Sequence, residues 1–215
     1  MVEEADRRGP YAKSARRKEQ IARAALEIVD AVGHDKLTTA AVAAVVGMSE
    51  RAVTYHFATR DDILVAALAL SDAEVVTEMP AGAKSYAESF DLIPDRIVRF
   101  HMTHPNRQRL FNLLSAQALD AQHPAHEYIR AHSQETVAAL AELVAGRQRL
   151  GLAHPDLDAE SVARQMLATW NGLTAQWTLD SSFDLADELK AAFHSLTGAP
   201  TMQARAVMRE ALAQI

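Results

Sequence analysis

Apolar residues recur at the spacing of an α-helix along most of this chain, and this periodicity is the feature that most restricts its fold. Near the N-terminus the repeat runs through Ile21, Ala25, Ile28 and Val32, and a second repeat spans residues 162–177. Intervals of three and four place such residues on one face of a helix. The sequence shows no hairpin signal, no strand-like alternation and no internal repeat. It therefore predicts an all-α fold.

Composition agrees with helices and excludes several classes of protein. The 215 residues, enough for one large domain or two small ones, include 8 glycines and 7 prolines, fewer than a sheet with many tight turns requires. The absence of cysteine excludes a disulfide scaffold, a thiolate zinc site and a cysteine nucleophile. No stretch approaches the roughly 18 apolar residues that cross a bilayer, and the acidic N-terminus is unlike a signal peptide. We expect a cytoplasmic protein with no membrane partner.

Charge is distributed unevenly along the chain. The net charge is −6, yet Lys and Arg outnumber Asp and Glu over residues 1–60, and the remainder is acidic. The stretch from Arg7 to Lys18 holds six basic residues and no acidic one. A basic end on an acidic body favours a polyanionic partner for that end alone. A solvated, disordered terminus would carry the same run of charge.

Capping residues and glycines divide the first part of the chain into four helices. Gly33 is suited to end the first helix as a C-cap. Thr38 and Ser49 are suited to begin the second and third as N-caps. The run Thr59-Arg60-Asp61-Asp62 resembles a capping box with aspartate in place of the usual glutamate or glutamine. The expected helices cover residues 14–32, 39–46, 49–57 and 59–76.

Prolines and an aspartate mark helix boundaries in the rest of the chain. Pro105 and Pro124 suit the first position of a helix, and Asp158 suits an N-cap. Pro94 is expected to interrupt the helix that contains it. The expected helices cover residues 105–120, 124–150, 158–180, 184–197 and 201–214.

The two short helices at residues 39–46 and 49–57 fit the helix-turn-helix unit. Small alanines in the first helix allow close approach, and Gly47 supplies a backbone conformation that other residues resist. In this motif the second helix enters the major groove of DNA and the first crosses the DNA backbone. A helical hairpin with no role in DNA binding has a similar pattern, so spacing alone leaves both interpretations open.

The same region resembles the DNA-binding domain of the TetR family of transcriptional repressors. The resemblance rests on the turn Gly47-Met48-Ser49, the run Tyr55-His56-Phe57 and the helix start Thr59-Arg60-Asp61-Asp62-Ile63-Leu64. With the preceding helix it covers about residues 14–65. The sequence departs from the family pattern at Thr54, where tyrosine is usual.

The resemblance implies an N-terminal three-helix helix-turn-helix DNA-binding domain, followed by a helical-bundle ligand-binding and dimerisation domain. The corresponding segments are residues 1–60, which include the basic arm, then residues 61–198, and a C-terminal tail of helical pattern at 199–215. By the same resemblance, helices 158–180 and 184–197 pair with their copies in a homodimer. The dimer would bind a pseudo-palindromic operator in double-stranded DNA, as a repressor that a small-molecule effector releases.

Candidate DNA contacts follow from the family pattern and from the chemistry of the side chains. By analogy, Thr39, Tyr55, His56 and Arg60 hold phosphates, which set register. Arg51 stands where the family commonly has glycine, and it can read guanine through two hydrogen bonds. The set is Thr38, Thr39, Ser49, Arg51, Thr54, Tyr55, His56 and Arg60. Phe57, next to this set, we expect in the core.

The basic segment from Arg7 to Lys18 gains interest from its place before the helix-turn-helix. A basic arm in this position can enter the minor groove. A free terminus remains the alternative.

Apolar residues of the second domain are candidates for an effector cavity, because sites in helical bundles have apolar walls with few polar groups. Each of them alone fits equally well in the core. The candidates are Met102, Phe111, Leu114, Gln117, Met166, Trp170, Asn171 and Trp177. They predict a largely apolar effector.

Histidines at 101, 104, 123, 126 and 132 have spacings compatible with metal ligands. His104 and His123 each precede proline, which places them at helix starts rather than on one shared face. We expect no metal and no cofactor.

Enzyme motifs for phosphate loops, dinucleotide binding, serine hydrolysis and zinc proteolysis are missing from the sequence. We therefore expect no enzyme. The alternatives are a helical ligand carrier or enzyme without DNA function, and a regulator of the same family that activates transcription.

Overall fold

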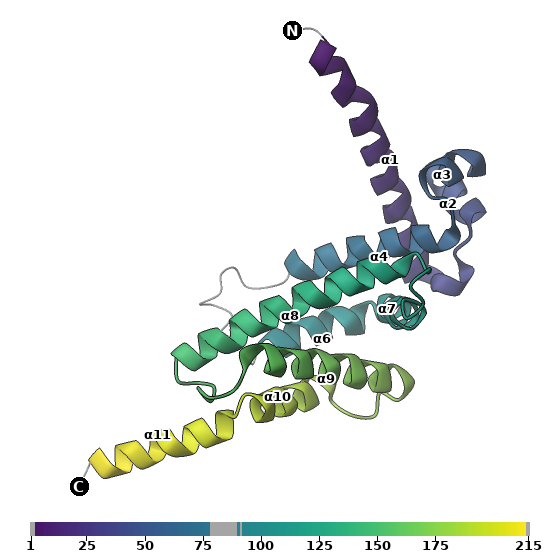
Figure 1. Ribbon diagram of the computed structural model, residues 1–215. Coiled ribbons are helices and arrows are strands. Elements are labelled where there is room, and N and C mark those ends of the chain that lie inside the picture. Colours follow the sequence, from purple (N-terminus) through teal and green to yellow (C-terminus); the bar gives the residue numbers. More distant parts are fainter. Residues whose placement is uncertain (1–2, 78–89, 91, 214–215) are drawn as a thin grey trace. The chain divides into compact units, whose positions relative to one another are not determined.

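The computed structural model describes residues 3–77, 90 and 92–213, and every regular element within them is helical. The all-α prediction is thereby confirmed for the described residues. Figure 1 labels the helices along the chain. They are α1 (Glu3–Val32), the 3-10 helix η1 (His34–Lys36), α2 (Thr39–Val46), α3 (Glu50–His56), α4 (Arg60–Thr77), α6 (Leu92–Thr103), α7 (Pro105–Gln117), α8 (Ala125–Arg149), α9 (Ala159–Leu179), α10 (Leu185–Leu196) and α11 (Ala199–Ala213).

The chain folds as two compact units. Unit 1 comprises Met1–Thr77 and Thr103–Ile129, and unit 2 comprises Glu78–Met102 and Arg130–Ile215. The sequence led us to expect a boundary near residue 60. The structure instead groups α4 and α7 with the helix-turn-helix, because all of them contribute to one apolar core.

The core of unit 1 forms where α1, α2, α3, α4 and α7 meet. Ile21 of α1, Val53 of α3, Leu64 of α4 and Leu110 of α7 are fully buried in it. Burying a large aliphatic side chain contributes about 1.5–3 kcal/mol. The short helices α2 and α3 are therefore held in position mainly by packing in this shared core.

The core of unit 2 is built from α8, α9 and α10, with Val98 contributed by α6. Val144, Met166 and Leu189 are fully buried in it. The guanidinium of Arg147 lies over the ring of Phe90, 4.1 Å from its centroid. This stacking keeps a buried cation against an aromatic face, an arrangement that favours arginine.

Local capping agrees with the sequence. The hydroxyl of Thr38 accepts a hydrogen bond from the Ala41 amide at 3.1 Å, and that of Ser49 accepts one from the Ala52 amide at 3.2 Å. The Asp158 carboxylate caps α9 in the same way. Gly47 ends α2 with φ of +64°, the left-handed conformation expected of it.

Some boundaries differ from the sequence prediction. Helix α1 begins at Glu3 rather than near residue 14, because polar residues can continue a helix without an apolar repeat to reveal it. Pro94 does not interrupt α6, since it lies in the first turn, where no amide is needed. Within the described part of the chain, no helix is long and apolar enough to cross a membrane.

Candidate nucleic-acid interface

Helix α3 presents one buried side and one open side. Val53 is fully buried in the core of unit 1, whereas Arg51, Thr54 and Tyr55 are exposed. Tyr55 is 84% exposed, so it contributes little to the core of unit 1. The structure thus brings three of the predicted DNA contacts together on the outer surface of the second helix of the motif.

The predicted contacts Thr38 and Ser49 act first as helix caps. Each hydroxyl oxygen accepts from a backbone amide of its own helix, at 3.1 Å and 3.2 Å. Such a hydroxyl still has its proton to donate. Both residues are exposed, and Thr39 beside them is half-buried at the first position of α2. Their hydroxyls can therefore hold the motif together and still donate to a phosphate oxygen.

His56 and Phe57 close α3 in different ways. The half-buried His56 ring meets the Tyr55 ring edge to face, with centroids 5.3 Å apart. Phe57 packs against the core of unit 1, as the sequence led us to expect.

Arg60, expected to hold a phosphate, is engaged elsewhere. Its Nε donates to the carbonyl oxygen of Leu37 at 2.8 Å, and its Nη2 donates to that of His34 at 2.5 Å. Its Nη1 lies 3.5 Å from the Asp61 carboxylate. The guanidinium therefore ties the first residue of α4 to the loop that precedes α2. Sequence reasoning missed this role, because the partners are backbone atoms 23 and 26 residues away.

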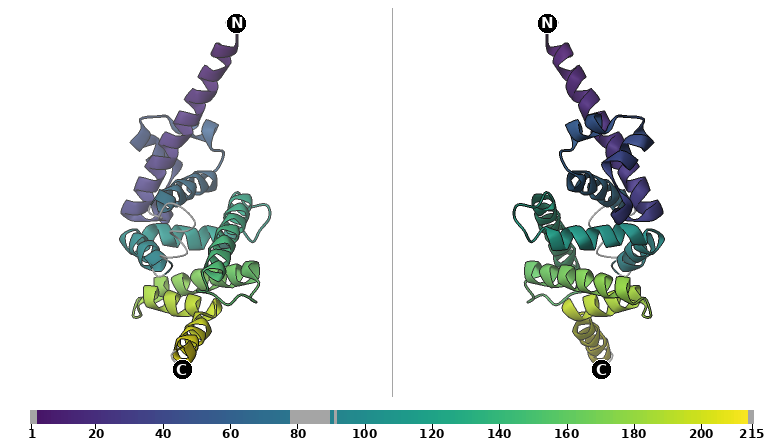
Figure 2. Two further views of the ribbon diagram at one scale, coloured as in Figure 1. Left: turned by 90° about the vertical axis from the view of Figure 1, so that its left-hand side faces the viewer. Right: turned by 90° about the vertical axis from the view of Figure 1, so that its right-hand side faces the viewer.

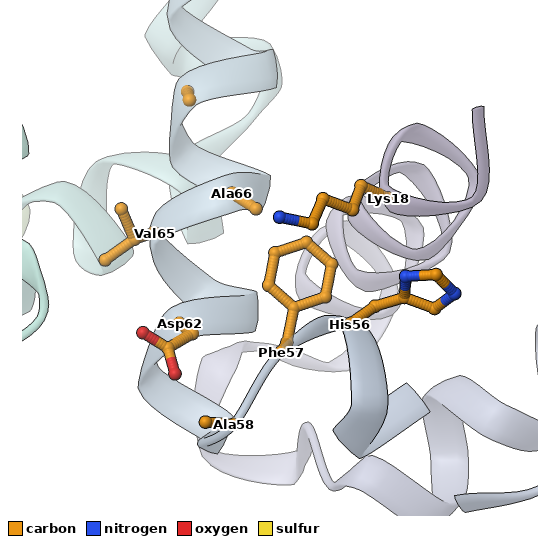
Figure 3. Close-up of a pocket in the computed structure, with 8 residues that line it drawn as sticks. Lys18, His56, Phe57, Ala58, Asp62, Val65 and Ala66 are labelled. Atoms are coloured by element: carbon orange, nitrogen blue, oxygen red, sulfur yellow. The ribbon is translucent and has the colours of Figure 1, made fainter. Parts of the chain in front are cut away.

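A pocket of about 410 Å³ opens beside the end of α3. In Figure 3, Lys18 of α1 reaches over the Phe57 ring, while Val65 and Ala66 of α4 line the opposite wall. The Lys18 ammonium lies 5.9 Å from the ring centroid, within reach of a cation–π interaction. The Asp62 carboxylate at the pocket is already occupied by the amide and hydroxyl of Thr59. The pocket thus has one cation at its mouth and a mainly apolar wall.

A three-membered ion cluster connects α7 to the two long helices of unit 1. Arg107 donates from Nε and Nη2 to the two carboxylate oxygens of Asp30 on α1, at 2.8 Å and 2.7 Å. Its Nη1 donates to Glu74 on α4 at 2.5 Å. Burial disfavours the charged form, but the hydrogen bonds that Arg107 donates to Asp30 and Glu74, together with their negative charges, outweigh it and raise the pKa of Arg107. Arg107 thus stays charged and fixes α7 to the helices that carry the DNA-binding motif.

The predicted effector residues divide between the two units. Leu114 is fully buried in the core of unit 1, where Phe111 packs against it. Met166 is fully buried in the core of unit 2, and Trp170 and Trp177 pack against that core. These residues therefore lie in or against a core, which is the alternative that the sequence allowed for each residue taken singly. The polar members differ, since Gln117 is half-buried and Asn171 is exposed, and Met102 is 55% exposed.

The histidines that follow α7 serve the turn into α8. His123 Nδ1 accepts from the Ala125 amide at 3.1 Å, and its Nε2 lies 3.5 Å from the Asp61 carboxylate. His126 Nδ1 lies 2.8 Å from the carbonyl oxygen of Ala118. Among the described residues, no group of three His, Asp or Glu side chains is arranged to hold a metal ion.

Solved structures with this fold belong to transcriptional regulators. A TetR transcription regulator from Haloarcula marismortui matches with a TM-score of 0.66 and 20% identity, covering 87% of this chain and 98% of that one. A protein of Saccharomonospora viridis, solved in complex with choline, matches with a TM-score of 0.62 and 17% identity, covering 84% and 95%. The TetR-family repressor FadR of Thermus thermophilus, solved with lauroyl-CoA, matches with a TM-score of 0.61 and 18% identity, covering 83% and 92%.

Two family profiles match the sequence itself. The profile of bacterial regulatory proteins of the tetR family matches residues 21–67, which contain the helix-turn-helix. The profile of the MftR C-terminal domain matches residues 103–214, more than half of the chain. A search of curated protein sequences found no significant match. The profiles and the fold agree, and the chain is a member of the TetR family of transcriptional regulators.

Proposed function

We propose that this protein is a homodimeric repressor that binds a pseudo-palindromic DNA operator and is released by a small-molecule effector. The observation that carries the proposal is the open face of α3, with Arg51, Thr54 and Tyr55 exposed on a helix whose other side is locked in a core. Tyr55 is 84% exposed, so its hydroxyl is free to reach a phosphate or a base edge.

The roles on α3 follow from reach and chemistry. Arg51, in the first turn, is the residue we assign to base reading, because its fork fits the two acceptors of guanine. Tyr55 and the two cap residues Thr38 and Ser49 are assigned to phosphates, which fix register without selecting sequence. The Thr54 hydroxyl donates a hydrogen bond to the Arg51 carbonyl oxygen at 3.1 Å. We expect this bond to keep Thr54 close to the base pairs that Arg51 reads.

The dimer interface is assigned to the outer faces of α9 and α10. On α9 the small residues Ala168 and Gly172 are exposed, and Leu179 farther along is 89% exposed. A methyl group added at Gly172 would meet no heavy atom within 4 Å in the single chain. Small exposed residues let two helices approach closely, and a C2 pair of such surfaces is self-complementary. Two copies of α3 would then reach successive major grooves about 34 Å apart.

The effector is assigned to unit 2, whose core contains Met166, with Trp170 and Trp177 packed against it. Relatives of the same fold were solved with choline and with lauroyl-CoA, so the fold accommodates chemically different ligands. We expect a largely apolar effector for this chain. It can release DNA only if it binds the DNA-free conformation more tightly than the DNA-bound one.

Selection of DNA from a random-sequence library by the purified full-length chain tests this proposal. Enrichment of a sequence with two inverted half-sites is expected, with binding that survives excess nonspecific DNA. A reporter gene placed behind the selected sequence separates repression from activation by the sign of the change. A library that yields no enriched sequence would contradict the proposal and favour a helical ligand carrier.

A further inference from the structure

The described side chains of α1 that precede Ile21, those of residues 12–20, take no part in a core. Helix α1 has 30 residues, and its first described buried side chain is Ile21. The part before Ile21 is about 27 Å long at a rise of 1.5 Å per residue. All views in Figures 1 and 2 show the beginning of α1 running beyond α2 and α3 without another helix beside it, and only its stretch around Lys18 comes close to the end of α3. Such a segment needs an explanation beyond packing.

The helix repeat places several cations on the same side of α1 as the core of unit 1. Arg17 precedes the buried Ile21 by four residues, and Lys13 precedes it by eight. Residues four apart lie above one another on a helix surface. Lys18 extends the same side, since its ammonium reaches over Phe57 at the end of α3. We call Lys13, Arg17 and Lys18 the basic row.

The opposite side of α1 has a different charge pattern. Glu19, Arg23 and Glu27 follow one another at intervals of four and are exposed. Arg16 precedes Glu19 by three residues and shares this side, and Arg23 lies 3.5 Å from Glu19. Cations and carboxylates therefore alternate here, whereas residues 12–20 include no carboxylate on the side of the basic row. Arg17 donates instead to the neutral amide of Gln20 at 2.8 Å.

We propose that the basic row is a second DNA-binding surface, which holds backbone phosphates beside the base pairs that α3 reads. This inference rests on the proposed function, because it assumes that α3 enters the major groove. The row lies on the side of α1 that faces the helix-turn-helix, so the same duplex can meet both. A helix about 10–12 Å across cannot enter a minor groove about 6 Å wide. The contact is therefore with phosphates, and it adds affinity without base preference.

The helical form of the segment is compatible with this role. Nucleation is the costly step of helix formation, and here the buried second half of α1 already supplies the nucleus. Alanine, lysine and arginine, which dominate residues 12–18, are all good helix formers. The cations are therefore presented at fixed intervals rather than on a flexible arm.

Two double variants with the same change of charge test the proposal. One is Lys13→Gln with Arg17→Gln in the basic row, and the control is Arg23→Gln on the opposite side of α1 with Arg109→Gln on α7, both of which are exposed. Glutamine preserves helix propensity, and circular dichroism checks that both variants are folded. The probe is the duplex selected by the parent chain, with affinity measured over a series of NaCl concentrations.

The slope of log affinity against log salt is the decisive quantity, because its magnitude falls by about 0.9 for each phosphate that the protein no longer neutralises. The basic-row variant is expected to bind about tenfold more weakly or worse. Its slope should be reduced by about 3–4, since a dimer of this variant leaves four phosphates without their cations. The control is expected to keep the slope of the parent. Equal slopes for all three proteins would overturn the inference while leaving the proposed function intact.

The minor groove is tested on the DNA itself. Replacing A·T pairs that flank the half-sites by G·C adds an amino group to the minor groove. Affinity is expected to be unchanged, and a loss that the basic-row variant no longer shows would overturn the assignment to phosphates. A parent chain that selects no sequence at all would instead remove the proposed function, and this inference with it.

Discussion

Arg107 on α7 makes a two-pronged hydrogen bond to Asp30 on α1, at 2.8 Å and 2.7 Å. The same guanidinium reaches Glu74 on α4. Helices α1 and α4 are the long helices that flank the DNA-binding motif. A displacement of α7 would therefore be transmitted to both helices. Two further contacts lead from the following segment to α4: Tyr128 donates to Asp72 at 2.5 Å, and His123 lies 3.5 Å from Asp61.

Replacing Arg107 by methionine should destabilise the protein by about 3 kcal/mol, because two carboxylates lose the cation that compensates them. The matched control is Arg109→Met, since Arg109 is exposed on the same helix and bonds only the neighbouring Asn106 side chain. Urea unfolding measures both. If the two variants lose equal stability, the cluster is not a special link between α7 and the motif.

Replacing Arg60 by lysine should weaken the loop before α2. Lysine keeps the charge but cannot bond the carbonyls of Leu37 and His34 together, and bonds from a charged donor contribute about 1.5–3 kcal/mol each at most. We expect a loss of about 1.5 kcal/mol in urea unfolding, with little change in the salt dependence of DNA binding. A lysine variant as stable as the parent would contradict the structural role of Arg60. The phosphate contact is tested by Arg60→Gln, which removes the charge and should leave the salt slope of the parent unchanged.

Replacing Ser49 by aspartate separates its two roles. Aspartate is as good an N-cap as serine, so the free energy of unfolding should stay within about 0.5 kcal/mol of the parent. A carboxylate next to phosphates should nevertheless weaken DNA binding strongly. Ser49→Ala, which loses the cap, should instead cost about 1 kcal/mol of stability. Normal DNA affinity in the aspartate variant would place Ser49 away from the duplex.

Replacing Gly172 by glutamate tests the dimer surface. The position is exposed with open space around it, and any residue other than proline stabilises a helix interior relative to glycine. The single chain should therefore fold at least as well, while a charge in the interface should shift the dimer towards monomers. Asn171→Glu, exposed on α9 but turned by about 100° around the helix from Gly172, is the control. Sedimentation that shows both variants dimeric would exclude this face of α9 from the interface.

The sequence predicted those parts of the fold that depend on near neighbours. The caps at Thr38, Ser49 and Asp158 and the left-handed turn at Gly47 all involve residues within four positions of one another. The contacts of Arg60 and Arg107 could not be predicted in this way, because their partners lie 23 to 77 residues away. An exposed arginine and a buried one look alike in a sequence until the fold brings their partners together.

The candidate site shows the same division. The resemblance to the family pattern and the chemistry of the side chains selected Arg51, Thr54 and Tyr55, and all three are exposed on α3 in the structure. The helical state of the first half of α1 could not be predicted, since a helix without an apolar repeat has the same composition as a disordered basic arm. The orientation of its cations becomes defined only because the same helix continues to the buried Ile21.

Replacing Arg51 by alanine should cost about 1–3 kcal/mol of DNA-binding free energy and relax the preference at one base pair in each half-site. Selection with the variant measures this directly. A variant that selects the parent sequence unchanged would remove Arg51 from base reading.

Two copies of this chain are expected to read two inverted half-sites through α3. The most direct test is the mass of the complex formed on the selected duplex in the presence of excess nonspecific DNA. We predict that two protomers bind the intact duplex and that scrambling one half-site abolishes stable binding. A complex with one protomer per duplex, or equal binding to the scrambled duplex, would contradict the account.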